Sequence, residues 1–256
     1  MVNDALIFRF AKVPDAIETL EKEMSLLCFL QNRITLPIPN PTYVCLDAKN
    51  IGEVFVGYPR IPGIPLWRKN FHKITDDGTK QHLAKQLARF LKELHQIPVD
   101  ELPVDLPIKD TPQYWMKMYT QIKEKLYPAM RPDARAAVTV HFEDFFTQSP
   151  NHEFQPRLRH GDFGTGNLLF DPDSQCITGV IDFGGVGLGD PATDFAGMYI
   201  SFGEAFYRHA YTVYPEMEPA LERVKFFIGT FALEEALFGF DNNDQDAYQA
   251  GMKNYI

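Results

Sequence analysis

The fold of this chain is decided by Leu158–Asp194, which has the sequence LRHGDFGTGNLLFDPDSQCITGVIDFGGVGLGDPATD. Within it, Leu168–Phe170 is predicted to form a short strand. Cys176–Ile181, which is apolar and β-branched apart from Gly179, is predicted to be a returning strand. Between them, Asp171–Gln175 predicts a turn, because proline fixes φ and Asp and Ser side chains hydrogen-bond their own backbone. The stretch therefore predicts a hairpin whose two open ends lie together.

Three oxygen-bearing side chains lie around the open end of this hairpin. Asn167 comes just before the first strand and Asp182 just after the second, while Asp162 lies upstream on the entering loop. Mg²⁺ prefers oxygen ligands and is usually bound by one or two protein groups together with substrate phosphates. The alternative is a solvated turn rich in Asp, but the glycines at 161, 164 and 166 let backbone approach a ligand closely. The stretch therefore predicts a Mg²⁺ site.

The same residues form a recognisable motif. His160-Gly161-Asp162, with Asn167 five residues after the aspartate, resembles the kinase catalytic loop H-x-D-x-x-x-x-N. Asp182-Phe183-Gly184 matches the metal-binding D-F-G triplet of kinases. Glycine at 161, the short gap to D-F-G and the tail over 189–196 resemble the aminoglycoside phosphotransferase family. The overall pattern is most similar to the enzymes of that family that act on the 2″-hydroxyl.

This resemblance implies an α+β, two-lobed, protein-kinase-like fold. Residues 1–60 would form a small N-terminal lobe with an antiparallel sheet, which binds the nucleotide. Residues 61–256 would form a larger, mainly helical lobe for catalysis and substrate binding. The family has two further strands and a phosphate-covering loop before the strand expected at 5–10. The N-terminal lobe is therefore expected to be truncated, with its first strands missing.

The resemblance also implies roles for individual residues. Phosphoryl transfer needs positioning and charge neutralisation more than covalent catalysis. Asp162 would be the base that orients the substrate hydroxyl and accepts its proton. Asn167 and Asp182 would bind Mg²⁺ against the phosphates of ATP or GTP. His160 and Asp194 would support the catalytic loop structurally.

The expected reaction is Mg²⁺-dependent transfer of the nucleotide γ-phosphate to a hydroxyl of a small molecule. An aminoglycoside antibiotic is the first candidate acceptor, and the enzyme would then confer resistance. A macrolide, choline, homoserine or a methylthio sugar would use the same chemistry. A nucleotide- or ligand-binding module with little catalysis is an alternative of another class, which the expected truncation favours. The intact Asp162, Asn167 and Asp182 argue against that module.

Basic and acidic residues near the N-terminus match the family's nucleotide contacts. Residues 5–10 predict a strand, and its Arg9 lies where the family has a lysine that contacts the phosphates. Lys12 is the alternative, since arginine does not replace a compact ammonium conservatively. Residues 14–31 predict a helix, whose Glu23 lies where the family has the glutamate that pairs with this basic residue. The alternative for Glu23 is a solvated helix glutamate.

A small sheet and a hinge are expected next. Residues 42–46 and 54–58 predict strands that complete the sheet with residues 5–10. Tyr58–Leu66 contains Pro and Gly residues that predict an inter-lobe linker. By resemblance this linker is the hinge that binds the adenine edge, where Pro59 would offer its carbonyl and Ile61 its N–H and carbonyl. The two interpretations are compatible.

The rest of the chain predicts mainly helices, over residues 79–96, 113–130, 133–147, 194–210 and 219–239. The first has a broad apolar face from Leu83 to Leu94, and His95 lies in its last turn, where we expect it to cap the C-terminus. In the last, Glu234 lies within a stripe of phenylalanines, and a buried carboxylate needs a partner. That partner is either an internal Arg or Lys or an ammonium of the substrate. The family's use of acidic residues on its C-terminal helix implies the ammonium. The adjacent Glu235, and Asp190 after the Gly-rich turn, are also predicted to bind substrate.

Composition and charge indicate which classes of binding partner are expected. The chain has 256 residues, a net charge of −9 and no Lys/Arg-rich run, so nucleic-acid binding is not expected. An acidic surface suits a cationic substrate but does not by itself identify one. Cys28, Cys45 and Cys176 have neither disulfide nor metal spacing and are predicted to be reduced core thiols of a cytoplasmic protein. No signal peptide and no apolar run of membrane-spanning length is present, so no membrane association is expected.

Overall fold

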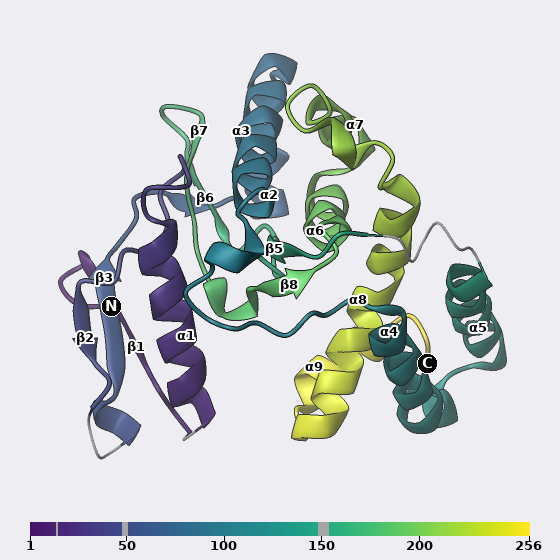
Figure 1. Cartoon of the computed structure of the whole chain (residues 1–256). Coiled ribbons are helices and arrows are strands. Elements are labelled where there is room, and N and C mark those ends of the chain that lie inside the picture. Colours follow the sequence, from purple (N-terminus) through teal and green to yellow (C-terminus); the bar gives the residue numbers. More distant parts are fainter. Residues whose placement is uncertain (14, 48–50, 148–153) are drawn as a thin grey trace.

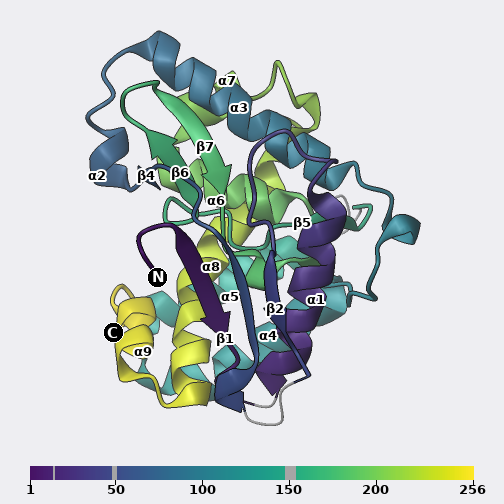
Figure 2. The ribbon, with the colours of Figure 1, turned by 90° about the vertical axis from the view of Figure 1, so that its left-hand side faces the viewer.

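The computed structural model describes residues 1–13, 15–47, 51–147 and 154–256 and places a small lobe beside a larger helical one (Figure 1). Pro14, with which the first predicted helix begins, lies outside the described residues. The small lobe contains an antiparallel sheet in the order β1-β3-β2, and Figure 2 has this lobe in front. Its elements are β1 (Leu6–Phe10), α1 (Asp15–Leu30), β2 (Tyr43–Cys45) and β3 (Phe55–Pro59). The three strands and the helix predicted there are confirmed.

Two separate hydrophobic cores underlie the two lobes. The small core contains Ala11, Val54 and Val56 from the sheet side and Leu20 from α1. The C-terminal half of α1 lies instead in the large core, where Leu26, Leu27 and Leu30 are fully or almost fully buried. α1 therefore joins the lobes, and the division of the chain at residue 60 remains a prediction.

The predicted hinge passes from one sheet to another. After β3, the N–H of Arg60 donates to the Ala5 carbonyl at 2.7 Å, and β4 (Ile64–Pro65) then pairs antiparallel with β6 (Leu168–Asp171). β6 pairs in turn with β7 (Cys176–Val180), as the hairpin prediction required. The link between the lobes is thus attached to the catalytic hairpin itself.

The large lobe is mainly helical. Its helices are α2 (Arg68–Phe71), α3 (Asp77–His95), α4 (Pro112–Gln121), α5 (Pro132–Thr147), α6 (Ala192–Phe202), α7 (Glu204–His209), α8 (Leu221–Asn242) and α9 (Gln245–Met252). Asp76 caps α3 by accepting the N–H of Thr79 at 2.6 Å. Among the described residues, no helix combines the length and apolarity needed to cross a membrane.

Two helix predictions need correction. The single helix expected at 194–210 is divided into α6 and α7 at Gly203, whose φ of 85° is not helical and is rarely adopted by other residues. In the segment expected to be helical over 113–130, the α-helix ends at Gln121. The chain then forms a π-helical turn (Ile122–Leu126) and a short 3₁₀ turn (Tyr127–Ala129). The apolar pattern continues through both breaks, so periodicity alone did not reveal them.

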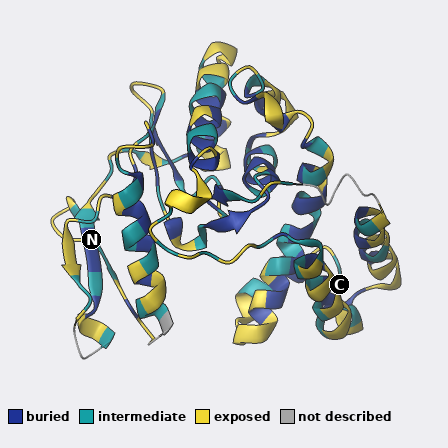
Figure 3. Ribbon diagram, in the orientation of Figure 1, coloured by how far each residue is buried: buried dark blue, intermediate teal, exposed yellow. Residues whose placement is uncertain are grey.

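A two-stranded ladder, which sequence patterns did not predict, leads directly into the catalytic loop. β5 (Arg157–Arg159) pairs antiparallel with β8 (Gly187–Gly189), so that Arg159 lies opposite Gly187. Both strands lie in the middle of the large lobe, and β8 is buried along its whole length (Figure 3). The catalytic loop therefore leaves one ladder and enters the other.

The cysteines are not core residues. All three are unpaired, Cys28 is exposed, and Cys45 and Cys176 are half-buried. The prediction of free thiols is therefore confirmed, while their placement in the core is wrong.

Candidate active site

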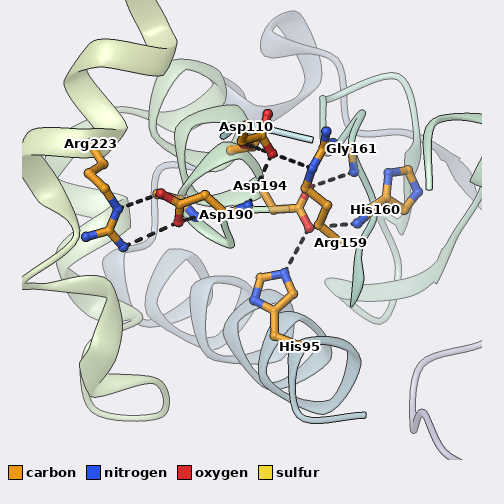
Figure 4. Close-up of polar contacts among 10 residues, drawn as sticks. His95, Asp110, Arg159, His160, Gly161, Asp190, Asp194 and Arg223 are labelled. Carbon is orange, nitrogen blue, oxygen red and sulfur yellow. Dashed lines mark hydrogen bonds and ion pairs between the residues drawn. The ribbon is translucent and has the colours of Figure 1, made fainter. Parts of the chain in front are cut away.

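A buried carboxylate holds the catalytic loop in place. Asp194, on the first turn of α6, accepts the N–H of His160 and the N–H of Gly161, each at 2.8 Å (Figure 4). His95 Nε2 lies 2.9 Å from Asp194 Oδ2, the same oxygen that accepts the His160 N–H, and its Nδ1 lies 3.3 Å from the Tyr214 hydroxyl. Burial raises the pKa of Asp194, but the hydrogen bond and the charge of His95 together lower it by more, so the net shift of this pKa is downward. His95 therefore orients Asp194 rather than capping α3.

Two features of the loop itself explain its sequence. Gly161 has φ of 79°, and a Cβ at this position would collide with the Gly185 carbonyl oxygen, so only glycine fits. His160 is fully buried and donates from Nε2 to the Ile181 carbonyl at 3.1 Å, while its ring packs against Phe183. Burial lowers the pKa of His160, so the ring is neutral and packs the loop against the hairpin.

The hairpin brings the three predicted oxygen-bearing side chains together. The amide nitrogen of Asn167 donates to the carbonyl of Asp162 at 2.9 Å and to its carboxylate at 2.8 Å. The Ile181 N–H donates to the Asn167 carbonyl at 2.9 Å, which places Asp182 beside Asn167. Asp182 has φ of 63°, a left-handed conformation that costs an aspartate on the order of 1 kcal/mol or more. Such strain is common where a side chain must be aimed at a ligand.

Asn167 and Asp182 have the donor atoms that a Mg²⁺ ion requires. Because the Asn167 amide nitrogen points at Asp162, the amide oxygen is turned away from it and has no partner among the described residues. Asp182 is half-exposed, and Arg9 is the only cation within 4 Å of it in the described part of the chain, at 3.7 Å. No group of three or more His, Cys, Asp or Glu side chains among the described residues is placed to bind a metal. Two oxygen donors without a closed cage suit an ion that is shared with phosphates.

A cavity of about 370 Å³ lies between the lobes on the Asp182 side. Its walls consist of Ile7, Arg9, Tyr58, Arg60, Ile61, Gly63, Pro65, Leu169, Ile181 and Asp182. Arg9 hydrogen-bonds to the buried carboxylate of Glu23, as the family slot predicted, whereas Lys12 is exposed. Burial raises the pKa of Glu23, and the charge of Arg9 opposes that shift. Of the two predicted hinge residues, Ile61 lies in the wall, and Pro59 pairs with Leu6 in the sheet outside it.

A second cavity, of about 430 Å³, lies on the Asp162 side of the loop. Its charged wall residues are Lys109, Asp110, Arg159, Asp162 and Glu234, and its aromatic ones are Tyr114, Trp115, Phe163, Phe227 and Phe231. Burial raises the pKa of Tyr114 to about 12, with Glu234 and Asp110 adding to the effect, so this phenol stays a neutral donor. The two cavities share no wall residue, and Asp162 lines one while Asp182 lines the other.

Glu234 lies in this second wall without an internal cation. It accepts the hydroxyl of Thr230 at 2.7 Å, and no Lys or Arg nitrogen of the described chain lies within 4 Å of it. Burial raises its pKa, and the charge of Asp110 adds to that effect. Glu235 is exposed on the next position of α8 and is not part of the wall, so the structure does not bring it to the cavity as it does Glu234.

Asp190 is not available to a substrate either. Its carboxylate is 1% exposed and pairs with Arg223, whose Nε lies 2.6 Å from Oδ2 (Figure 4). Its other oxygen accepts the Ala192 N–H at 2.9 Å, at the start of α6. Both oxygens are therefore used inside the protein, and the expectation that Asp190 faces the cleft is wrong.

Sequence patterns missed a buried ion pair in the wall of the acceptor-side cavity. Arg159 Nε lies 2.8 Å from Asp110 Oδ2, and both side chains are buried. The same carboxylate oxygen accepts the Asp190 N–H at 3.2 Å and the Thr193 hydroxyl at 3.3 Å. Burial raises the pKa of Asp110, and Arg159 opposes that shift. The only local sequence signal near Asp110 was Thr111, the N-cap of α4. It predicts where a helix starts but does not reveal that the neighbouring Asp110 pairs with Arg159.

Fold and site together define a two-lobed, kinase-like phosphotransferase. The model of the phosphotransferase enzyme family matches residues 2–227 of this chain. The chain belongs to this family, and the predicted family, fold and class of enzyme are confirmed.

Individual relatives agree with that assignment. Viomycin phosphotransferase of Streptomyces vinaceus is 27% identical over 200 residues, which are 77% of this chain and 67% of the relative. The GDP complex of aminoglycoside 2'-phosphotransferase-IIIa superposes with a TM-score of 0.91 at 27% identity, over 99% of this chain and 85% of that one. A GDP and kanamycin complex of APH(2")-IIIa gives a TM-score of 0.89 at the same identity, over 99% and 86% of the two chains.

Proposed function

We propose that this protein transfers the γ-phosphate of ATP or GTP to a hydroxyl of an aminoglycoside-type antibiotic. The observation behind the proposal is that the catalytic loop and the hairpin that follows it line two separate cavities. Asp162 lines the cavity with aromatic and charged walls, and Asp182 lines the cavity at the hinge. Asn167 is hydrogen-bonded to Asp162 and adjacent in space to Asp182. An acceptor on one side and a nucleotide on the other would meet at this loop.

In the proposed reaction, the acceptor hydroxyl oxygen forms a bond to the γ-phosphorus. The bond from that phosphorus to the oxygen bridging the β- and γ-phosphates breaks, and the nucleoside diphosphate leaves. Asp162 orients the hydroxyl and accepts its proton, and Asn167 fixes the Asp162 carboxylate by the 2.8 Å hydrogen bond. Asp194 and His160 position the loop without contacting either reactant.

The nucleotide would occupy the hinge cavity. Arg9, fixed by Glu23, would contact its phosphates, and the backbone of Ile61 would meet the base, because this backbone has no hydrogen bond in the described part of the chain. Asn167 and Asp182 would bind Mg²⁺ through their oxygens. When bound, that ion neutralises charge that develops on the phosphates.

The acceptor would occupy the other cavity. A carboxylate without an internal cation in an aromatic wall suits a cationic ring, since ammonium groups pair with Glu234 and ring faces pack on aromatic side chains. The kanamycin complex of a neighbour and the name of the viomycin relative support an antibiotic as acceptor.

Transfer of γ-labelled phosphate from ATP and GTP to a panel of aminoglycosides and to viomycin tests the proposal. We expect labelled product with the unaltered protein and a loss of about 10³-fold in kcat with Asp162→Asn, because a general base contributes roughly 10²–10⁴-fold. Asp173→Asn, an exposed carboxylate at the tip of the same hairpin, is the matched control and should be fully active. Product formation that survives Asp162→Asn would refute the assigned base. Absence of product with every acceptor would refute the proposed substrate class.

A further inference from the structure

Lys109 lines the acceptor cavity but has no role in the proposed reaction. Its backbone is fixed, because its N–H donates to the Leu188 carbonyl at 2.8 Å and the preceding Ile108 forms a parallel bridge with the same residue of β8. The next residue, Asp110, is held by the buried pair with Arg159. The start of the Lys109 side chain is thus placed by the same ladder that supports the catalytic loop.

The charges of the cavity wall do not all find partners within the protein. Asp110 pairs with Arg159, and the Asp162 carboxylate accepts the Asn167 amide. Lys109 and Glu234 remain, and neither forms an ion pair within 4 Å in the described part of the chain. Apart from Asp162, which is assigned to the acceptor hydroxyl, the cavity therefore presents one ammonium, Lys109, and one carboxylate, Glu234, that have no ion-pair partner in the described part of the chain.

The environment of Lys109 disfavours its charged form, so an oxygen group of a ligand would stabilise the ammonium. Burial lowers the pKa of Lys109, the charge of Arg159 lowers it further, and Asp110 and Glu234 oppose the shift. A lysine ammonium has three N–H donors and no acceptor. It can therefore bind a hydroxyl, carbonyl or carboxylate oxygen of a ligand, whereas a ligand ammonium at the same place would be repelled.

We propose that Lys109 is a specificity-determining residue, which binds an oxygen group of the acceptor and excludes an ammonium from that position, while Glu234 binds an ammonium elsewhere on the same molecule. The preferred acceptor is then an amino sugar or similar compound with mixed amino and oxygen substituents, rather than one that is aminated throughout. This inference rests on the proposed function, because it concerns the cavity assigned to the acceptor.

Matched acceptors that differ only in one hydroxyl or amino group test the inference. Two such pairs are kanamycin A with kanamycin B, and paromomycin with neomycin. Binding is measured by calorimetry in the presence of GDP, where no transfer occurs, and kcat/KM is measured separately with the nucleoside triphosphate. For at least one pair, the unaltered protein should bind the hydroxyl member about tenfold more tightly, because apposed like charges are disfavoured at a binding site.

The variants then assign the preference to this side chain. Lys109→Met should reduce the binding ratio to near one, Lys109→Glu should reverse it, and Lys109→Arg should retain it. Lys117→Met, an exposed lysine on α4, is the matched control and should leave the ratio unchanged. Unchanged GDP affinity and thermal midpoint in each variant would show that the fold is intact.

The outcomes separate this inference from the proposed function. Equal binding of both members of both pairs by the unaltered protein, or a ratio that survives Lys109→Met, would overturn the role of Lys109. Binding with the expected ratios but without transfer would overturn the proposed reaction and leave the role of Lys109 supported. Absence of binding by all four compounds would overturn both.

Discussion

The two cavities beside the catalytic loop are built in different ways. The hinge cavity is formed by short strands and the linker between them, and its charged wall residues are Arg9, Arg60 and Asp182. The acceptor-side cavity is formed by segments from Lys109 to Glu234, with five aromatic and five charged side chains in its wall. The donor phosphates are the same in every turnover of such a reaction, and a few local contacts suffice for them. Recognition of an acceptor needs a shaped wall, which several packed helices provide.

A single buried network supports both cavities. Asp194 fixes the loop that contributes Asp162 to one cavity, and His160, held by the same carboxylate, packs against the strand that leads to Asp182 in the other. Changes in this network should therefore affect both sides, whereas changes in either wall should affect one side only.

Removal of the Asp194 carboxylate should have the largest effect. Asp194→Ala leaves the N–H groups of His160 and Gly161 and the ring of His95 without an acceptor in a buried place, so we expect a loss of about 3 kcal/mol or more in unfolding free energy. Urea denaturation measures this loss, and binding of GDP and acceptor should both weaken. Asp246→Ala, an exposed aspartate on α9, is the control. A stable variant that loses only one of the two affinities would contradict the shared role.

Changes at Arg9 and Glu23 should affect the nucleotide side alone. Arg9→Met removes the charge that faces the phosphates, and we expect the nucleotide KM to rise by about tenfold to a hundredfold, as for loss of a charge-assisted contact worth roughly 1.5–3 kcal/mol. Glu23→Gln should have a smaller effect in the same direction, because it weakens the partner that orients Arg9. Steady-state kinetics with both substrates varied measures this separation. A larger effect from Lys12→Met than from Arg9→Met would show that the other basic residue contacts the phosphates.

Neutralisation of Glu234 should affect the acceptor side alone. Glu234→Gln keeps the size of the side chain and its contact with Thr230 but removes the charge, and the acceptor KM should rise about tenfold, within the usual range for a charged hydrogen bond. Glu235→Gln, on the exposed face of the same helix, is the matched control and should leave the KM unchanged. Equal effects of both substitutions would show that only general surface charge attracts the acceptor.

The smallest effect concerns pH. Burial lowers the folded-state pKa of His160 and of His141 below the ordinary value of 6.5, so both rings are neutral in the folded protein and bind protons more readily when unfolded. Their contribution is fully present above pH 6.5 and is lost as the pH falls through the folded pKa values. Between pH 6.5 and the folded pKa values, the unfolding free energy should then decrease by up to about 1.4 kcal/mol per histidine for each pH unit. Denaturation between pH 5 and 8 measures the slope.

Variants assign that slope to the two regions. His160→Gln should reduce the slope and weaken binding on both sides of the loop, whereas His141→Gln, at the contact of α5 with the Phe226 carbonyl, should reduce the slope and leave GDP affinity unchanged. A slope that is unchanged in both variants would assign the acid sensitivity to other groups.

Local sequence was sufficient for the parts of the site that lie close together in the chain. The hairpin places Asn167 and Asp182 side by side through ordinary strand pairing, and proline and aspartate in its turn define where it folds. Gly161 is required by a backbone conformation that other residues rarely adopt. Glu234 was identified because a carboxylate in an apolar stripe demands a partner. The family resemblance added Arg9 and Glu23, whose hydrogen bond the structure contains.

Other residues could not be assigned in this way. Asp190 has the same local signals as a cleft residue, yet it forms a buried ion pair with Arg223 of α8. Lys109, Asp110 and Arg159 have no local pattern that distinguishes them from surface charges, and they meet only because the ladder of β5 and β8 brings their segments together. His95 lies in the last turn of α3 as its sequence predicts, but its side chain reaches Asp194 because α3 packs beside β5.

The sequence by itself determined the catalytic hairpin, the family and the class of reaction, because these depend on neighbouring residues and on backbone conformations that particular residue types require. Only the tertiary structure decided which charges are free to meet a ligand. Whether a carboxylate or ammonium is free depends on which distant side chain lies within hydrogen-bonding distance, and burial makes that pairing decisive. For this reason Asp190 and Asp110 are internal partners, while Glu234 and Lys109 remain available in the cavity.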